Sequence, residues 1–237
     1  GDDKVSNWTD SSQNGNALVS PPSGGLGSQR PNIAVSSDYA NKQVAVFDAD
    51  DEKTMINESP PASLDIGLGD FLWAGAFTSN SGVGAQVVFS AQKESGSEIR
   101  VELTAAGLPR FRIGTLVTTT GSDSIHDSAT LMVCTRISGT ISLFINGAVS
   151  GTPVGGTTIS INSDTPYRLG SMDLGGGKGV QAFFDGEIAE FFFGGSSSTG
   201  VITTYDRQRV EGYLAHEVGI SSVLPTSHPY KYGPPRV

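Results

Sequence analysis

Three carboxylates near the end of the chain have a spacing that could support sugar chemistry. Asp185, Glu187 and Glu190 lie within the β-patterned run AFFDGEIAEFFF. Retaining glycosidases use two carboxyl groups about 5–5.5 Å apart on one side of the sugar. In a regular strand Asp185 and Glu187 share a face and Glu190 points to the other, so a bulge would be needed to bring it round. We therefore expect solvated carboxylates, no catalytic residue and no enzyme, with a glycosidase or lyase as the third-ranked alternative.

A second acidic group, Asp48, Asp50, Asp51 and Glu52, follows the β-patterned run QVAVFD. Hard oxygen ligands suit calcium, and Asp48, Asp50 and Asp51 are the candidate ligands. The full calcium-loop pattern is absent, because no glycine stands at its turn position. A solvated loop is the simpler interpretation. Asp50 and Asp51 are also candidates for binding sugar hydroxyls, because carboxylates accept hydrogen bonds.

The segment GSDSIHDS, residues 121–128, brings serine, histidine and aspartate together in sequence. A catalytic triad is defined by geometry and not by proximity along the chain, and no G-x-S-x-G motif occurs anywhere. A polar loop between strands is the better interpretation. Its His126 and Asp127 are candidate ligand-binding residues.

The two tryptophans receive different interpretations. Trp73 lies inside the apolar run DFLWAGAF and is expected in the core. Trp8 lies in a polar segment and is a candidate for stacking on a sugar ring, since aromatic side chains have large apolar faces. Packing beneath the sheet is the alternative for Trp8, and the one that we favour.

Charge and hydropathy exclude two classes of partner. Fifteen basic and 24 acidic residues give a net charge of −9, which argues against nucleic-acid binding. No run of about 18 apolar residues is present, so no membrane insertion is expected, and no signal-peptide pattern opens the sequence. The one cysteine, Cys134, cannot form an internal disulfide and is expected to be buried.

The elements that must position these residues are mostly strands. Runs with β-branched and aromatic residues in period-two alternation recur along the chain, separated by Gly, Asn, Asp and Ser. They cover residues 43–48, 70–79, 85–92, 98–104, 129–137, 140–147, 157–161, 166–171 and 182–193. Ser138-Gly139 and Asn146-Gly147 are hairpin signals. This rhythm predicts an antiparallel β-sandwich and argues against a βαβ fold.

Both ends of the chain depart from the strand pattern. Residues 1–42 are polar and are predicted to be irregular, residues 203–219 to form a helix, and the Pro-rich residues 220–237 to form an extended tail. The helix signals are a cap at Thr203 or Thr204, Asp206 in the first turn and a stop at Gly219. The apolar face is predicted at Val210, Tyr213, Leu214 and Val218, with Arg207, Arg209 and His216 solvated.

Motifs along nearly the whole chain resemble laminin-G-like domains of the concanavalin A-like lectin/glucanase jelly-roll type. The matching segments, in order, are KVSNWTDSSQNGN (4–16), QVAVFDADDE (43–52), DFLWAGAF (70–77), LFINGAVSG (143–151), YRLGS (167–171), DGEIAE (185–190), EGYLA (211–215) and LPTSHPY (224–230). The resemblance implies an all-β jelly roll with one C-terminal α-helix, as a single domain over residues 1–237. The variant is similar to bacterial or phage members, and its DGEIAE segment fits a non-catalytic pattern.

One departure from the family pattern concerns the sheet edge. Family members usually have a strand reading like LWLDA before the W-x-D loop, and here only GDDKV precedes it. A missing strand would leave a sheet edge unpaired, which proteins normally avoid. The strand either lies in sequence outside this chain or is supplied by another chain, so we expect a subunit contact at this edge.

The resemblance favours a non-enzymatic surface module that binds glycans or a cell-surface protein in adhesion. The alternative is a virion structural component, such as a capsid decoration, fibre or tail protein, that assembles through the sheet edge and the tail. Both functions predict an extracellular, cell-surface or virion-surface location. The second predicts a homo-oligomer or a larger assembly with virion proteins.

Overall fold

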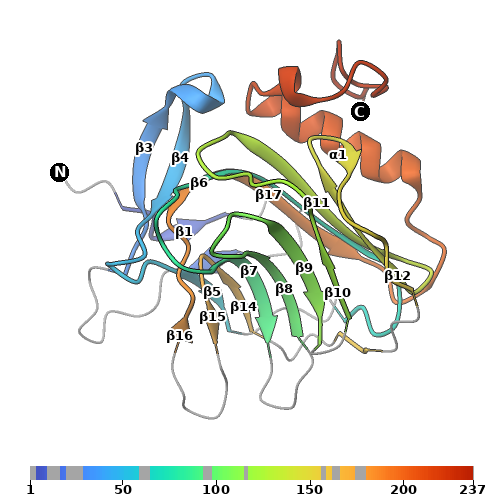
Figure 1. Ribbon diagram of the computed structural model, residues 1–237, viewed down its shortest axis with the longest axis horizontal. Coiled ribbons are helices and arrows are strands. Elements are labelled where there is room, and N and C mark those ends of the chain that lie inside the picture. The colour runs from blue at the N-terminus through green and yellow to red at the C-terminus, as the bar shows by residue number, and fades with distance from the viewer. Residues whose placement is uncertain are drawn as a thin grey trace.

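The computed structural model describes residues 4–9, 17–19, 29–58, 65–92, 98–114, 117–155, 159–161, 166–173 and 180–236. Within these residues two antiparallel sheets face each other, and one α-helix lies outside the sandwich (Figure 1). The predicted all-β jelly-roll sandwich with a C-terminal helix is therefore confirmed.

The first sheet has eight strands. In spatial order they are β1 (Asn7–Trp8), β2 (Leu18–Val19), β5 (Met55–Asn57), β14 (Tyr167–Leu169), β7 (Gln86–Gln92), β8 (Glu98–Leu103), β9 (Pro109–Ile113) and β10 (Val117–Thr120). A short hairpin of β15 (Met172–Asp173) and β16 (Val180–Gln181) follows β14 and contacts β7.

The second sheet has seven strands. In spatial order they are β13 (Ala148–Val149), β12 (Thr140–Ile145), β11 (Thr130–Ile137), β6 (Phe71–Ser79), β17 (Gly186–Gly195), β4 (Lys42–Phe47) and β3 (Asn32–Ser36). The central strands β11, β6 and β17 are joined by long antiparallel ladders. They form the middle layer of the molecule, between the core and the helix (Figure 1).

The two predicted hairpin turns are confirmed by their backbone angles. Ser138 and Gly139 have φ values of 49° and 75°, and Asn146 and Gly147 have 53° and 80°. Two successive positive φ angles match the twist of the flanking strands, and asparagine and glycine tolerate them best. These turns fix the register of β11 with β12 and of β12 with β13.

Two expectations about local structure are wrong. Residues 1–42 are not irregular throughout, because β1, β2 and β3 lie there, followed by the 3₁₀ helix η1 (Ser37–Tyr39). These strands form by pairing, β1 with β2, β2 with β5 and β3 with β4, and local composition does not encode these pairings. The run at 157–161 forms no strand in its described part: Ile161 makes an isolated bridge to Gly67, and residues 157–158 lie outside the described residues.

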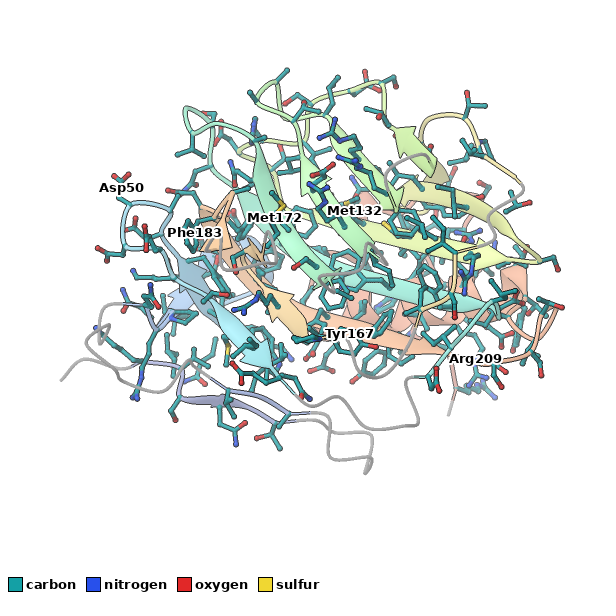
Figure 2. All side chains as sticks on the ribbon, turned by 90° about the horizontal axis from the view of Figure 1, so that it is seen from below. Asp50, Met132, Tyr167, Met172, Phe183 and Arg209 are labelled. Carbon is teal, nitrogen blue, oxygen red and sulfur yellow. The ribbon has the colours of Figure 1, made fainter. Side chains whose placement is uncertain are left out.

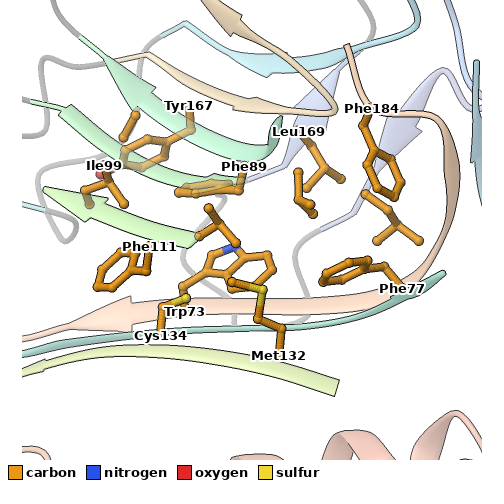
Figure 3. Close-up of a cluster of buried hydrophobic side chains, with 14 of the residues drawn as sticks. Trp73, Phe77, Phe89, Ile99, Phe111, Met132, Cys134, Tyr167, Leu169 and Phe184 are labelled. Atoms are coloured by element: carbon orange, nitrogen blue, oxygen red, sulfur yellow. The ribbon is translucent and has the colours of Figure 1, made fainter. Parts of the chain in front are cut away.

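The core fills the space between the sheets with aromatic and aliphatic side chains (Figure 3). Trp73 and Phe77 of the seven-stranded sheet meet Phe89 and Phe111 of the eight-stranded sheet, and all four are essentially inaccessible. Phe77 and Phe184 pack edge to face, with ring centroids 5.8 Å apart and an interplanar angle of 87°. Each fully buried side chain of this size contributes about 1.5–3 kcal/mol through the hydrophobic effect. This core holds the strands that carry the candidate sites.

Cys134 lies in β11 opposite Trp73, inside this core. Its side chain is fully buried, and burial raises the pKa of its thiol. The thiolate is the reactive form of cysteine, so this side chain acts as a small apolar residue. In the described part of the chain, no helix has the length and apolarity needed to cross a membrane.

Helix α1 (Thr204–Glu217) begins as predicted. Thr203 is its N-cap: its hydroxyl accepts a hydrogen bond from the Asp206 N–H, and the Asp206 carboxylate accepts one from the Thr203 N–H. This reciprocal capping box satisfies two backbone donors that the first turn leaves free. The helix packs on the outer face of the seven-stranded sheet, where Leu214 and Val218 are buried.

The predicted polar face of α1 is partly wrong. Arg207 is 6% exposed, whereas Tyr213, expected on the apolar face, is 51% exposed. The Arg207 guanidinium lies 3.9 Å from the ring centroid of Phe144 in β12 and pairs with Glu211 at 2.5 Å. A buried partner one turn away allows this arginine to pack against the sheet. Sequence periodicity alone treats arginine as polar and cannot show this.

The C-terminal tail folds back on α1 instead of running extended. Its His228 is 5% exposed, and the imidazole Nε2 lies 3.0 Å from the buried carboxylate of Glu211. Within the tail, the 3₁₀ helix η3 (Ser221–Val223) follows α1, and Lys231 donates hydrogen bonds to carbonyls of that turn. The predicted extended tail is therefore a compact cover over α1 (Figure 1).

Candidate functional site

A group of charged side chains projects from the outer face of the eight-stranded sheet. Ile99, Val101 and Leu103 of β8 point into the core, and Phe111 and Ile113 of β9 do the same. Because successive side chains alternate between faces, the residues between them point outward. They are Arg100 and Glu102 on β8 and Arg110 and Arg112 on β9. We call the surface around these four residues the arginine face.

Glu102 is the centre of the group. Its side chain is only 4% exposed, and its carboxylate accepts a hydrogen bond from Arg110 Nε at 2.5 Å. The terminal nitrogens of Arg100 and Arg112 lie 3.6 Å and 3.7 Å from the same carboxylate. A buried carboxylate requires such partners, because an unpaired charge in a protein interior is very costly. The group is therefore held rigidly on two adjacent strands.

The arginines also face one another. Arg100 pairs directly with Arg112 across β8 and β9, and Ser90 of β7 lies opposite Arg100 on its other side. Burial lowers the pKa of Arg100, Glu102 opposes this shift, and the neighbouring Arg112 and Arg110 add to the lowering. Like charges directly opposite each other destabilise a sheet. The Glu102 carboxylate, which contacts all three arginines, therefore offsets part of this repulsion.

The β15–β16 hairpin borders the arginine face on the β7 side. The Arg100 guanidinium contacts Met172 Sδ at 3.1 Å, and the Ser90 hydroxyl donates to the Ser171 carbonyl at 2.8 Å. On the other side, Thr120 of β10 pairs with Arg110 and is exposed. Figure 2 looks onto this side of the molecule, where Met172 is labelled. The face therefore offers guanidinium donors, a hydroxyl and an apolar border.

The predicted residues His126 and Asp127 lie in another place, on the loop that precedes β11. The His126 ring Nδ1 is 3.0 Å from the Ser79 hydroxyl, and the Asp127 N–H donates to the Ser79 carbonyl at 2.7 Å. Asp127 accepts from the Ser81 N–H at 3.0 Å, and hydrogen bonds from Ser81 lower the pKa of its carboxyl. Both residues therefore tie the loop to the end of β6.

A second pair of loops meets at the same end of β6. Asn80 donates a side-chain hydrogen bond to Asp185, and its backbone N–H donates to the Asp185 carbonyl at 2.9 Å. Gln86 bridges the two segments: its amide donates to the Asn80 carbonyl and accepts from the Asp185 N–H. These bonds occupy the polar groups that would otherwise be available to a ligand. The binding roles of His126 and Asp127 remain predictions.

The predicted calcium loop has a turn built around Asp48. Its carboxylate accepts from the Asp50 N–H at 3.0 Å, and Lys53 Nζ lies 3.4 Å from Asp51 and 3.9 Å from Asp48. The Lys53 side chain is 4% exposed, so the lysine already supplies positive charge beneath the loop. Among the described residues no group of three or more His, Cys, Asp or Glu side chains could hold a metal. The geometry gives the calcium prediction for Asp48, Asp50 and Asp51 no support.

Trp8 packs against Phe191 of β17, with ring centroids 5.3 Å apart and an interplanar angle of 71°. It is partly buried against the core, as the favoured packing interpretation predicts. Its other side lines an open pocket of about 240 Å³, together with Asn7, Gln43 and Glu190. A stacking role for Trp8 on a sugar therefore remains a prediction.

The pocket lies where β17 separates from β4. The ladder between them covers only Gly186 to Ile188, although β17 continues to Gly195 in its pairing with β6. Beyond Ile188 the Phe191 N–H donates to the carboxylate of its neighbour Glu190 at 3.3 Å. Within the described residues this segment of β17 is therefore paired on its β6 side only. The subunit contact expected from the missing strand stays a prediction.

The bulge that sugar-cleaving carboxylates would need is present in β17. The register shifts between Ile188 and Glu190, so that Glu187 pairs with Thr78 and Glu190 with Ala76. Thr78 and Ala76 are two residues apart on β6, so both glutamates point to the same face. This is the helix-covered face, where burial raises the pKa of Glu190. The glutamates are half-buried and not solvated as we expected.

The fold defines a lectin-type β-sandwich, and the sequence agrees with this class. The family model described as the concanavalin A-like lectin/glucanases superfamily matches residues 73–193, more than half of the chain. The chain belongs to this laminin-G-like family. No curated protein matches the sequence significantly.

Solved structures share the fold at low sequence identity. The binding domain of botulinum neurotoxin DC, in complex with SialylT, superposes with a TM-score of 0.54 and 11% identity, over 95% of this chain and 52% of that chain. A mutant NanB sialidase from Streptococcus pneumoniae gives 0.50 and 13%, over 69% and 26%. The Ruminococcus gnavus IT-sialidase CBM40 bound to α2,3-sialyllactose gives 0.46 and 14%, over 54% and 77%. At these identities the similarity to the toxin domain and to the NanB sialidase shows the fold alone.

The arginine face was not predicted from the sequence, although a signal for it exists. In EIRVELT and PRFRI the charged residues occupy alternate positions, which places them on one face of each strand. The sequence pattern does not give the register of β8 with β9, which pairs Arg110 with Glu102 and Arg112 with Arg100.

Proposed function

We propose that the protein is a non-catalytic glycan-binding module and that its binding surface is the arginine face. The observation that carries the proposal is the group of planar charged side chains around Glu102, held on two strands of the outer sheet face and partly accessible to solvent. Sugar sites use a few fixed polar groups to orient hydroxyls, together with apolar contact area. Glu102 and Arg110 supply the fixed polar groups, and the hairpin that contains Met172 supplies the apolar contact area.

Membership in the lectin/glucanase superfamily supports a carbohydrate ligand. The toxin binding domain, which shares the fold, was solved with SialylT. Adhesion to cell-surface glycans on the outside of a cell or virion is the biological role that we propose for such a module.

A non-catalytic role agrees with the placement of the carboxylates. Glu187 and Glu190 share a face, but that face lies toward α1. Burial raises the pKa of the Glu190 carboxyl, and the nearby Glu217 carboxylate of α1 adds to the rise. Catalysis would require a sugar to reach both carboxylates from one side. Incubation with oligosaccharides and detection of reducing ends tests this point. Cleavage that disappears in Glu190→Gln would overturn the non-catalytic assignment.

The binding proposal is tested with a glycan array followed by isothermal titration calorimetry on the strongest hit. The double variant Glu102→Gln/Arg110→Gln removes one charge of each sign, so the net charge stays at the −9 of the native chain. We expect it to lose affinity about tenfold or more, because hydrogen bonds to charged groups are worth about 1.5–3 kcal/mol. Arg209→Gln on α1 is the matched control. Equal binding by both variants would exclude the arginine face.

A second candidate function, assembly into a larger structure such as a virion component, is favoured by the free part of β17. Phe192 in this segment is 43% exposed, and unpaired strand edges are templates for pairing with another chain. Light scattering after size-exclusion chromatography tests it. Phe192→Lys should prevent assembly, whereas Val149→Lys at the opposite edge strand β13 should not. A monomer at all concentrations would exclude self-assembly.

A further inference from the structure

We infer that the pocket between β1, β4 and β17 binds the primary ammonium group of an alkylamine, such as a lysine side chain. The pocket has a volume of about 240 Å³ and lies where β17 separates from β4. In the eight-stranded sheet β1 is at the opposite end from β8 and β9, so this site is separate from the arginine face. Three features support the inference: a carboxylate without a cation, an aromatic wall and a set of neutral oxygen acceptors.

The carboxylate belongs to Glu190, which is the one charged side chain among the described residues that line the pocket. Glu190 is half-buried, and its carboxylate accepts a hydrogen bond from the backbone N–H of Phe191 at 3.3 Å. Lys42 acts electrostatically on Glu190 but forms its ion pair with Glu217 of α1, at 2.6 Å. Glu190 therefore has no ion-pair partner of its own within the described residues. A carboxylate removed from water gains much from such a partner.

The electrostatic environment of Glu190 favours a cation. Burial raises the pKa of its carboxyl, Glu217 adds to the rise, and Lys42 opposes it. The rise means that the ionised carboxylate is disfavoured in its present surroundings. An ammonium group in contact with the carboxylate favours the ionised form and lowers this pKa, whereas an anion would raise it further.

Trp8 forms the aromatic wall of the pocket. Phe191 packs against the indole at an interplanar angle of 71°, which positions the ring. Among the aromatic side chains indole attracts cations best, because the face of its π-system is negative. Val44 and Ile33 also line the pocket and provide apolar contact area. An alkylammonium matches both properties, since it joins a charged head to an apolar stem.

Neutral oxygen acceptors complete the pocket. Asn7, Thr9 and Gln43 line it and are exposed, and each has a side-chain oxygen that can accept a hydrogen bond. A primary ammonium has three N–H donors and no acceptor, so it can bond to a carboxylate and to neutral oxygens together. A quaternary ammonium lacks these donors and would be held by the indole and by charge alone. The lining therefore fits a primary ammonium better than a trimethylated one.

The test compares three probes that differ only at the end of the side chain: Nα-acetyl-lysine methylamide, its Nε-trimethyl derivative and Nα-acetyl-norleucine methylamide. NMR titrations of the ¹⁵N-labelled protein give the dissociation constants, with the indole N–H signals of Trp8 and Trp73 as reporters. We expect the lysine probe to bind about tenfold or more tightly than the uncharged norleucine probe. The signal of Trp8 should move with added probe, whereas that of the fully buried Trp73 should not.

n-Butylamine serves as a fourth probe, because it carries the same ammonium group without a peptide backbone. An affinity equal to that of the lysine probe assigns a free alkylamine as the ligand. Weaker binding of n-butylamine assigns a lysine side chain within a peptide.

Substitution of Glu190 tests the role of the carboxylate. Glu190→Gln should weaken the lysine probe by about tenfold or more and leave the norleucine probe unchanged. Glu187→Gln is the matched control, because Glu187 is in the same strand and carries the same charge but does not line the pocket, so its effect should be much smaller. Trp8→Phe keeps an aromatic ring that attracts cations less and should weaken the lysine probe by less than Glu190→Gln does. Circular dichroism and the melting temperature show whether each variant remains folded.

Three results would count against the ammonium site. Equal affinity for the lysine and norleucine probes, or equal losses in Glu190→Gln and Glu187→Gln, would overturn it. The absence of a shift at Trp8 with every probe would do the same. Tighter binding of the trimethylated probe than of the lysine probe would overturn the assignment of a primary ammonium. Glycan binding at the arginine face is measured separately and does not depend on these results.

Discussion

The two sheets of the molecule each carry an arginine–glutamate group on the outer face, and the two groups differ in their partners and in their exposure to solvent. Next to the seven-stranded sheet, Arg207 and His228 share Glu211, and Phe144 covers the guanidinium. On the eight-stranded sheet three arginines share Glu102, and their side chains are 14%, 30% and 20% exposed.

This difference suggests two roles: the group around Glu211 stabilises the fold, whereas the group around Glu102 is suited to binding a ligand. Around Glu211 every charged group has a partner within the described residues, and the tail shields the group from solvent. Around Glu102 three arginines share a carboxylate and keep contact with solvent. A group sealed from solvent contributes to stability when intact, whereas a group that solvent reaches can also contact a ligand.

The largest effect should come from breaking the sealed group. Glu211→Ala leaves the buried Arg207 without its carboxylate, so the free energy of unfolding should fall by about 3–5 kcal/mol. Chemical denaturation with urea measures this loss. Glu217→Ala on the same helix removes an exposed ion pair with Lys42 and should cost less than about 1 kcal/mol. Similar losses in the two variants would contradict the distinction.

A smaller loss of stability is expected from Trp8→Ala, which removes the contact with Phe191. Full burial of a tryptophan is worth about 3–5 kcal/mol on truncation, and Trp8 is only partly buried, so we expect about 2 kcal/mol. Sugar affinity should not change, because Trp8 lies away from the arginine face. A fall in affinity at an unchanged melting temperature would instead favour stacking of Trp8 on a sugar.

The group around Glu102 is tested by Glu102→Gln. The variant removes the carboxylate that the three arginines share, and we expect the free energy of unfolding to fall by about 1–2 kcal/mol, because these side chains still reach water. Sodium sulfate should restore more stability to this variant than to the native protein. Sodium chloride at equal ionic strength is the control, and an identical response to both salts would show that sulfate does not replace the carboxylate among the arginines.

The smallest effect concerns calcium. Lys53 lies beneath the acidic loop and pairs with Asp48 and Asp51, so a chelator should leave the melting temperature and sugar binding unchanged. Differential scanning fluorimetry with EDTA and with added calcium checks this. Stabilisation by calcium that is lost in Asp51→Asn would restore the calcium-site interpretation.

The sequence predicts those features whose signals are local. The turns at Ser138-Gly139 and Asn146-Gly147 and the cap at Thr203 depend on neighbouring residues and are confirmed. Strand alternation also predicts most of the strands, although the run at 157–161 forms none in its described part. The bulge in β17 depends on its pairing with β6, which lies about a hundred residues earlier in the chain, so the shared face of Glu187 and Glu190 could not be predicted.

The same limit explains the errors about charged side chains. Arg207 and His228 are polar by type, and only the return of the tail over α1 gives them a buried partner in Glu211. The arginine face needs the register of β8 with β9, which determines whether neighbours are opposite or like in charge. Candidate residues chosen for their loop positions, such as His126 and Asp127, instead bond to the adjacent backbone and hydroxyls.

The compact tail also affects the order of events during synthesis on the ribosome. The strands and α1 emerge before residues 225–231, so Glu211 remains without His228 until the tail leaves the exit tunnel. Domains generally fold as units during synthesis, so the buried group around Glu211 can be completed only after the tail has emerged.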